Sequence, residues 1–141
     1  MEHSPIGPTN TGPATTFTGD AYVTMIAGPS DNSRLSAALV RFTPGARSNW
    51  HSHDAGQTLH GAEGHGLVGT RDGRILHIRP GETVWTPPGE EHWHGALQDT
   101  LMAHYALLDV NADGSDPTRW LEPVTDEQYR AAHEATDGSQ R

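Results

Sequence analysis

The sequence predicts a single all-β domain, a small antiparallel barrel or jelly roll, and three observations support this class. Sixteen glycines and ten prolines in 141 residues interrupt the chain too often for long helices. Short apolar stretches recur at close spacing, and each ends at Gly, Pro, Asp or Asn, which is typical of barrels and sandwiches. The length fits one domain with one core, so we expect a single site.

The elements follow in order along the chain. Residues 1–16 contain Pro, Gly, Thr and Ser with almost no large apolar side chains, so we expect a flexible N-terminal arm there. The barrel is expected over residues 17–122, with strands in the stretches AYVTMIAG, LSAALVRFTPG, TLHGAEGHGLVGT, RILHIRPG, ETVWTPPG and LMAHYALLDV. Between two of these strands, the Asp-Gly sequence in residues 71–73 predicts a hairpin turn.

The last segment, residues 123–141, predicts one short C-terminal helix and a tail. Thr125 suits the N-cap, and Gln128 stands three residues later, where it can complete a capping box. Asp126 and Glu127 favour the positive end of the helix dipole. The apolar side chains expected to dock this helix on the barrel are Trp120, Leu121 and Tyr129.

The composition excludes several classes of protein. Nine basic and eighteen acidic residues give a formal net charge of −9, which disfavours nucleic acid and anionic membranes as partners. The absence of cysteine excludes disulfides, thiolate metal sites and cysteine nucleophiles, so a metal would need nitrogen and oxygen ligands. The N-terminus has no basic start and no apolar run, and no segment is long enough to span a bilayer. We therefore expect a cytoplasmic protein with a small-molecule substrate.

Histidines are concentrated in the middle of the chain, where eight of the ten lie within residues 51–104. Alternate side chains of a strand share a face, so His51, His53 and Gln57 are expected to point the same way. A fourth ligand must come from a distant strand, and His92 follows a rigid Pro-Pro-Gly turn. The alternative is a group of surface histidines, or a metal-free site in which these side chains hydrogen-bond one another.

The spacing of these residues resembles the two motifs of the cupin family. The first motif matches from Gly45 through the two histidines to Gly64, with Gln57 where most cupins have glutamate. The second matches from Gly81 to His92, although Ala96 stands where that motif usually ends in asparagine. The resemblance covers roughly residues 35–108 and implies a cupin barrel whose metal ligands are His51, His53, Gln57 and His92.

Four segments are similar to those of small bacterial manganese cupins that include the (R)-selective hydroxynitrile lyases, namely ARSNWHSHDAGQTL, VWTPPGEEHWHGA, MAHYA and VTDEQYR. This resemblance implies Mn(II), a homo-oligomer (dimer or tetramer) and a histidine acid and base on the strand after the second motif. The matching residue is His104. Its apolar neighbours indicate burial, and a buried imidazole needs a hydrogen-bond partner or a chemical role. A core histidine with a structural role is the alternative.

Five residues are expected to form the substrate pocket. Two of them align with pocket-wall positions of the lyases, and a third aligns with a position at which the lyases can carry a polar residue. A fourth shares the strand face of His92, and the fifth is a tryptophan beside the first motif. In that order they are Ala38 and Val40, Leu108, His94 and Trp50. Trp85 and Trp93 are expected to wall the same cavity. We have no physical account of the cluster His60, Glu63 and His65.

The expected ligand set favours a Lewis-acidic ion. Three neutral imidazoles and one amide leave the charge of a divalent ion uncancelled. This charge favours a reaction in which the ion polarises the substrate over one in which the ion is oxidised to a trivalent state. We expect a lyase that cleaves the carbon-carbon bond of a cyanohydrin. The alternatives are an Fe(II)-dependent dioxygenase, an isomerase, cyclase or decarboxylase, and a small-ligand sensor. Mn(II) is the expected ion, and Fe(II), Ni(II), Co(II) and Zn(II) are the alternatives.

Overall fold

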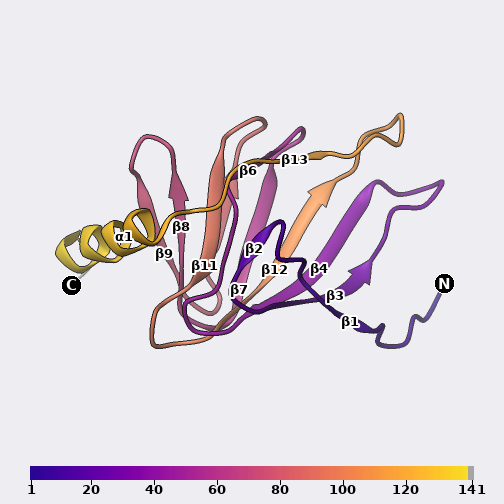
Figure 1. Ribbon diagram of the computed structural model, residues 1–141. Helices are drawn as coiled ribbons and strands as arrows, with labels where there is room; N and C mark the ends of the chain where they lie inside the picture. Colours follow the sequence, from indigo (N-terminus) through magenta and orange to yellow (C-terminus); the bar gives the residue numbers. More distant parts are fainter. Residues whose placement is uncertain (140–141) are drawn as a thin grey trace.

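Over residues 1–139, which the structure describes, the strands of this computed structural model form two curled antiparallel sheets (Figure 1). The first sheet has six strands in the order β1 (Thr9–Thr11), β3 (Ala21–Ala27), β4 (Leu35–Phe42), β12 (Met102–Asp109), β7 (Gln57–Gly64) and β10 (Thr83–Thr86). Strand β12 is central, because it pairs with β4 on one side and with β7 on the other.

The second sheet is built from shorter strands. One path runs through β13 (Thr118–Trp120), β6 (His51–His53), β11 (His92–Ala96), β5 (Arg47–Ser48) and β2 (Phe17–Thr18). Strand β8 (Gly66–Thr70) pairs with β11 and with β9 (Ile75–Ile78). The predicted hairpin at residues 71–73 joins β8 to β9 and is confirmed, with Gly73 at φ 88° in the left-handed region that glycine adopts without strain.

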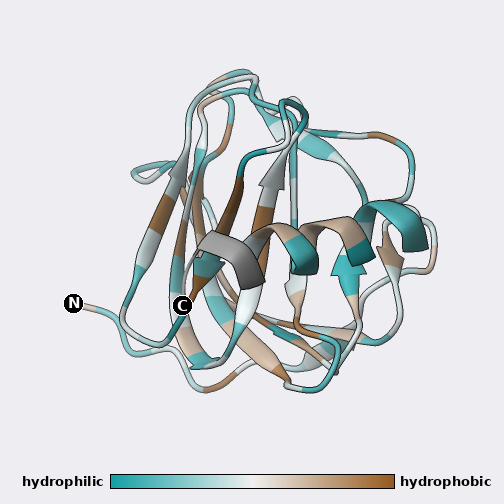
Figure 2. Ribbon diagram, turned by 90° about the vertical axis from the view of Figure 1, so that its left-hand side faces the viewer, coloured by the Kyte–Doolittle hydropathy of each residue, from teal (hydrophilic) through white to brown (hydrophobic). Residues whose placement is uncertain are grey.

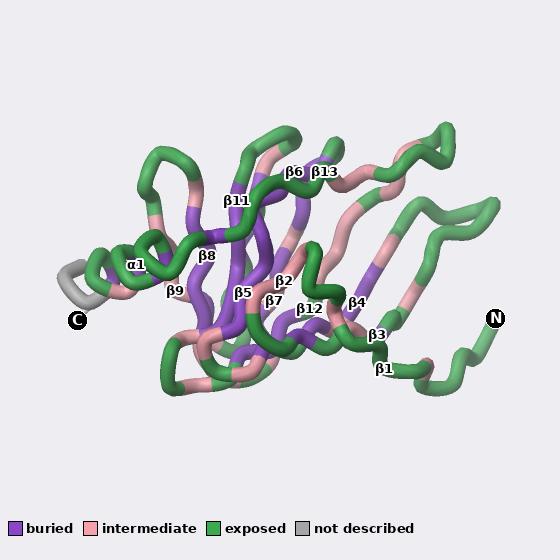
Figure 3. The backbone as a smooth tube through the Cα atoms, viewed as in Figure 1, coloured by how far each residue is buried: buried purple, intermediate pink, exposed green. Residues whose placement is uncertain are grey.

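The main core fills the space between the sheets. Alternate side chains of strand β4 point to the same side, so Ala38, Val40 and Phe42 share one buried face that contributes to this core. Leu59 and Met102 reach the same cluster from β7 and β12. Figure 2 shows the apolar residues concentrated along the strands, and Figure 3 shows that buried stretches follow these strands while many of the connecting turns are exposed. The predicted all-β class is confirmed.

Helix α1 (Asp126–Ser139) lies against the outer side of the second sheet (Figure 1). Its predicted capping box is confirmed, because the Gln128 amide donates to Thr125 Oγ1 at 3.0 Å and the Thr125 amide donates to Gln128 Oε1 at 2.9 Å. A second core under the helix contains Trp50, Leu67, Trp93, Val124, Tyr129 and Ala132. No helix within residues 1–139 has the length and apolar character needed to cross a membrane.

The N-terminal arm differs in one respect from the expectation. Residues 9–11 form β1, which adds an edge strand to β3, and the hydroxyls of Thr9 and Thr24 hydrogen-bond at 2.7 Å. Without β1 the backbone of β3 would present an open edge, and pairing satisfies its amide and carbonyl groups. Before this strand the arm remains exposed, as the 95% exposure of Ile6 shows.

Candidate metal centre

Three histidines meet on the inner face of the second sheet. His51 and His53 alternate along β6, and His92 on β11 is paired directly with His51. The ring nitrogens of the three lie within 4.8 Å of one another, and all three side chains are buried. The period of two along a strand and the register between two strands therefore bring together residues 41 positions apart.

Hydrogen bonds on the far side of each ring fix how the rings are turned. Nδ1 of His51 donates to the carbonyl of Asn49 at 2.9 Å, and Nδ1 of His92 donates to the carbonyl of Glu90 at 3.0 Å. Nδ1 of His53 lies 3.0 Å from Thr118 Oγ1. A carbonyl can only accept, so in the neutral rings of His51 and His92 the lone pair is left on Nε2, as a metal ligand requires.

The chemistry of the inner atoms fits a divalent cation. Gln57 Oε1 lies 3.3 Å from His92 Nε2, so a carbonyl oxygen faces the nitrogen that carries a lone pair. Nε2 of His53 is buried and has no hydrogen-bond partner among residues 1–139. Burying hydrogen-bond acceptor atoms without a donor costs free energy. One cation bound by these nitrogen and oxygen atoms would satisfy all of them. The four residues that the sequence proposes as ligands, His51, His53, Gln57 and His92, thus lie together.

Burial also sets the protonation of these rings. Desolvation, followed by the neighbouring His92 and His53, lowers the pKa of His51 well below its ordinary value. Desolvation and the neighbouring His92 lower the pKa of His53 to about 4, and desolvation lowers the pKa of His92. The three imidazoles are therefore neutral at pH 7, the form that binds metals.

Acid is expected to destabilise the metal-free protein. Burial holds the pKa of His53 and of His104 at about 4, whereas an unfolded histidine titrates near 6.5. Between these values the unfolded chain binds more protons, so the free energy of unfolding falls as pH drops from about 6.5 to 4. At pH 5 the loss is about 2 kcal/mol for each histidine, which lowers the melting temperature by about 10 °C relative to pH 7.5. Thermal melts in EDTA measure this shift, and a constant melting temperature would contradict neutral buried rings.

His104 lies across the barrel on β12 and is fully buried. Its Nε2 is 2.9 Å from Nδ1 of His94, and Nε2 of His94 is 3.3 Å from Nε2 of His51. In the metal-free protein His51 accepts at Nε2, so the protons of this row of neutral rings run from His104 to His94 and from His94 to His51. A metal at His51 Nε2 would take up that lone pair and leave the hydrogen bond between His104 and His94 in place. Burial lowers the pKa of His104 to about 4 and that of His94 well below its ordinary value. His94 therefore links the predicted acid and base to a predicted ligand.

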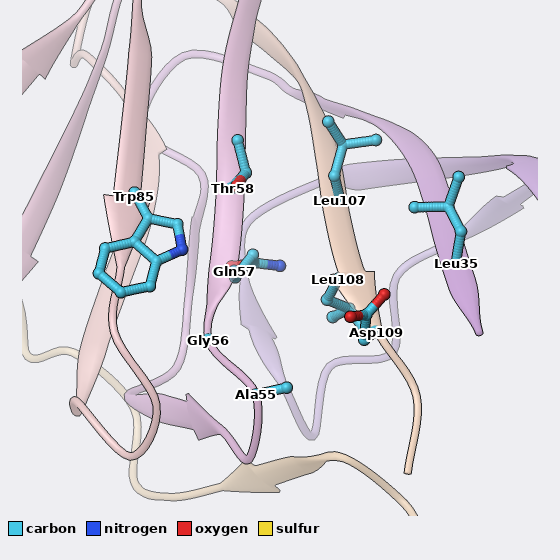
Figure 4. Close-up of a pocket in the computed structure, with 9 residues that line it drawn as sticks. All are labelled: Leu35, Ala55, Gly56, Gln57, Thr58, Trp85, Leu107, Leu108 and Asp109. Carbon is cyan, nitrogen blue, oxygen red and sulfur yellow. The ribbon is translucent and has the colours of Figure 1, made fainter. Parts of the chain in front are cut away.

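The apolar pocket residues lie near this row. Val40 is the cross-strand partner of His104, and Ala38 is the partner of Ala106 on the same inner face. Leu108 is half-buried near the end of β12. Together with Gln57 and other side chains, it lines a groove of about 230 Å³ (Figure 4).

The three tryptophans beside the motifs do not wall the histidine site, and this prediction is wrong. Trp50 and Trp93 belong to the second core under helix α1. Trp93 stands between His92 and His94 on β11, so strand alternation turns it to the opposite face. Trp85 is 59% exposed on β10 and borders the groove of Figure 4 from outside.

Two aromatic residues were missed by the sequence reasoning. Trp120 was expected to dock the helix, but its ring packs against the ring of His51 with centroids 4.7 Å apart. The ring centroid of Phe42 lies 5.8 Å from that of His94 and 5.5 Å from that of His104. Strand β13 has three residues, and only the alternation of Thr118 with Trp120 signals that both share the face of the metal centre.

The remaining histidines of the cluster do not form one site. His60 lies outside the barrel, with Nδ1 2.9 Å from Thr83 Oγ1. Nδ1 of His65 lies 3.3 Å from Nε2 of His77. The sequence HGAEGHG therefore divides between two separate hydrogen-bonded pairs.

Comparison with known proteins gives consistent results. A family model described as Cupin domain matches residues 38–111. The (R)-mandelonitrile lyase of Granulicella tundricola is 44% identical over 119 residues, which are 84% of this chain and 89% of that protein. A cupin-like protein of Thermotoga maritima has a TM-score of 0.79 and 32% identity, covering 94% of this chain and 97% of its own. The polyketide cyclase RemF of Streptomyces resistomycificus shares the fold alone, with a TM-score of 0.61 and 18% identity over 78% of this chain and 76% of its own.

Proposed function

This chain belongs to the cupin family, and on that premise we propose that it is a metal-dependent lyase that splits a cyanohydrin into an aldehyde and hydrogen cyanide. The observation that carries the proposal is the buried row in which His94 connects His104 to His51. The row supports a proton acceptor at Nδ1 of His104, which keeps its lone pair when Nε2 donates to His94 and has no hydrogen-bond partner among residues 1–139. The 44% identity to a relative named (R)-mandelonitrile lyase supports the same reaction.

The residues that would hold the ion are His51, His53, Gln57 and His92, and Mn(II) is the ion we propose. When bound, it would supply a Lewis acid whose charge the four neutral ligands leave uncancelled. The hydrogen bonds that His51 and His92 donate to the carbonyls of Asn49 and Glu90, and the one between His53 and Thr118, keep the imidazoles oriented for this task.

His104 takes the proton of the substrate's hydroxyl group. It is neutral at pH 7, so it can act as a base, and its hydrogen bond to His94 spreads the positive charge that it gains. As the O–H bond breaks, its electron pair forms the carbonyl double bond of the aldehyde. The bond to the nitrile carbon breaks at the same time, and its electron pair leaves with cyanide. Cyanide then receives the proton from His104, which restores the neutral imidazole.

The test combines elemental analysis with an assay of mandelonitrile cleavage, in air and under anaerobic conditions. We expect about one metal ion per chain and release of benzaldehyde at the same rate in both atmospheres. Cleavage that requires oxygen, or a fully metal-loaded protein that releases no benzaldehyde, would reject the lyase. A protein that binds no divalent metal would reject the ligand assignment itself.

A further inference from the structure

Trp120 lies at the edge of the second sheet with its ring on the inner face. It is the cross-strand partner of His51, and Thr118 two residues earlier is the partner of His53, so β13 continues the face that carries the metal centre. The indole packs on the His51 ring with an angle of 33° between the planes. The side chain is nevertheless 41% exposed, so much of its surface is free for contact with a ligand.

A row of aromatic rings leads from this exposed indole to the proposed acid and base. Phe17 on β2 lies 5.9 Å from Trp120 and 6.0 Å from Phe42, measured between ring centroids. Phe42 in turn contacts His104 at 5.5 Å. Phe42 and His104 are buried, so these packed ring contacts join the exposed indole to the proposed acid and base through the core.

The facing sheet presents an apolar side chain that is also accessible. Met25 on β3 pairs with Ala38 and therefore shares the inner face of the first sheet, yet it is 46% exposed. Exposed Met25 and Trp120 are unusual on faces that otherwise form the core, because inward apolar side chains gain stability from burial. Aromatic groups make favourable contacts with both a thioether and an indole.

We propose that the exposed surface of Trp120 binds the aryl group of the substrate, which makes Trp120 a specificity-determining residue for aryl cyanohydrins. This inference rests on the proposed lyase function. Phe17 supports the indole from the side, and the contact with His51 fixes it relative to the metal centre. Stacked or tilted aromatic pairs add affinity beyond that of the buried area alone, so an aliphatic substrate gains less at this position.

The kinetic test compares Trp120→Leu and Trp120→Phe with Tyr22→Leu, the loss of an exposed aromatic side chain on the outer face of β3. The substrates are mandelonitrile and the aliphatic 2-hydroxybutanenitrile. For Trp120→Leu we expect KM for mandelonitrile to rise about tenfold, with kcat and the aliphatic KM changed less than about twofold. The KM of Trp120→Phe should lie between those of Trp120→Leu and the unchanged protein, and Tyr22→Leu should match the unchanged protein. Equal effects on both substrates, or none, would overturn the inference.

A binding measurement separates this inference from the proposed function. Benzaldehyde is titrated into the ¹⁵N-labelled protein loaded with diamagnetic Zn(II), because paramagnetic Mn(II) would broaden the signal of an indole that packs on His51. The indole N–H signals are followed, with that of Trp120 assigned through Trp120→Phe. The chain contains no lysine, so the aldehyde cannot form imines with side chains. We expect a saturable shift of the Trp120 signal, no shift of the signal of Trp93, which is buried under helix α1, and no saturable shift with propanal. This result supports aryl binding even if no cyanohydrin is cleaved, and an unmoved Trp120 signal overturns it even if the lyase is active.

Discussion

A His104→Ala variant is expected to lose lyase activity by a factor of about 10² to 10⁴, while its metal content stays that of the unchanged protein. His104 is a fully buried side chain on a strand separate from those of the candidate ligands, so its loss removes the proton acceptor and leaves the ligands in place. Its low pKa keeps the base form present down to about pH 5, so the loss should be of similar size from pH 5 to pH 8. Steady-state kinetics and elemental analysis of the same preparation measure both quantities.

His60→Ala is the matched control for that variant. His60 lies on the neighbouring strand β7, and its imidazole hydrogen-bonds Thr83 on the outside of the barrel. This variant should keep both its metal and its kcat. A His104→Asn variant keeps a polar group in the buried position, which checks that lost activity does not come from a collapsed core. If either His104 variant turned over at the normal rate, His104 would be structural.

A His53→Ala variant is expected to lose the metal together with the activity. Removal of one of the four predicted ligands should weaken metal affinity by more than the roughly 10- to 100-fold that loss of an outer hydrogen-bond partner costs. His53 suits this test because it takes no part in the row that joins His104, His94 and His51. Its Nε2 has no other hydrogen-bond partner within the described residues, so the variant breaks no other hydrogen bond at that atom. Metal titration by calorimetry and the mandelonitrile assay measure the two losses.

His77→Ala is the control for metal binding, because His77 belongs to the pair with His65 and lies apart from the metal centre. It should bind metal as the unchanged protein does. A His53→Ala protein that retained one tightly bound ion per chain would exclude His53 as a ligand. In the metal-free state, the same variant should lose part of its sensitivity to acid, since one imidazole with a lowered pKa has been removed.

Local features of the sequence were sufficient for most of the fold. The hairpin at residues 71–73 and the capping box of Thr125 and Gln128 depend on neighbouring residues, and both are confirmed. Strand β1 escaped prediction because Thr9–Thr11 has no apolar pattern of its own. It is a strand because the edge of β3 offers unpaired backbone groups, a property of another part of the chain.

At the candidate site, residue spacing along the chain was enough to identify the potential ligands. Alternation along a strand requires His51 and His53 to share a face, and the cupin spacing assigns His92 to the same site. Alternation along β11 already turns Trp93 away from His92 and His94, but what each aromatic residue packs against depends on tertiary structure. Trp50 and Trp93 point under the helix, and Trp120 reaches His51 although 69 positions separate them.

The contact between His94 and His104 likewise depends on tertiary packing, because the two residues come from different sheets. No local pattern in the sequence signals that their rings meet. The alternation of side chains along a strand is a local property of the backbone, so it can be predicted from the sequence. The choice of neighbours depends on which strands pair and on how the two sheets pack against each other.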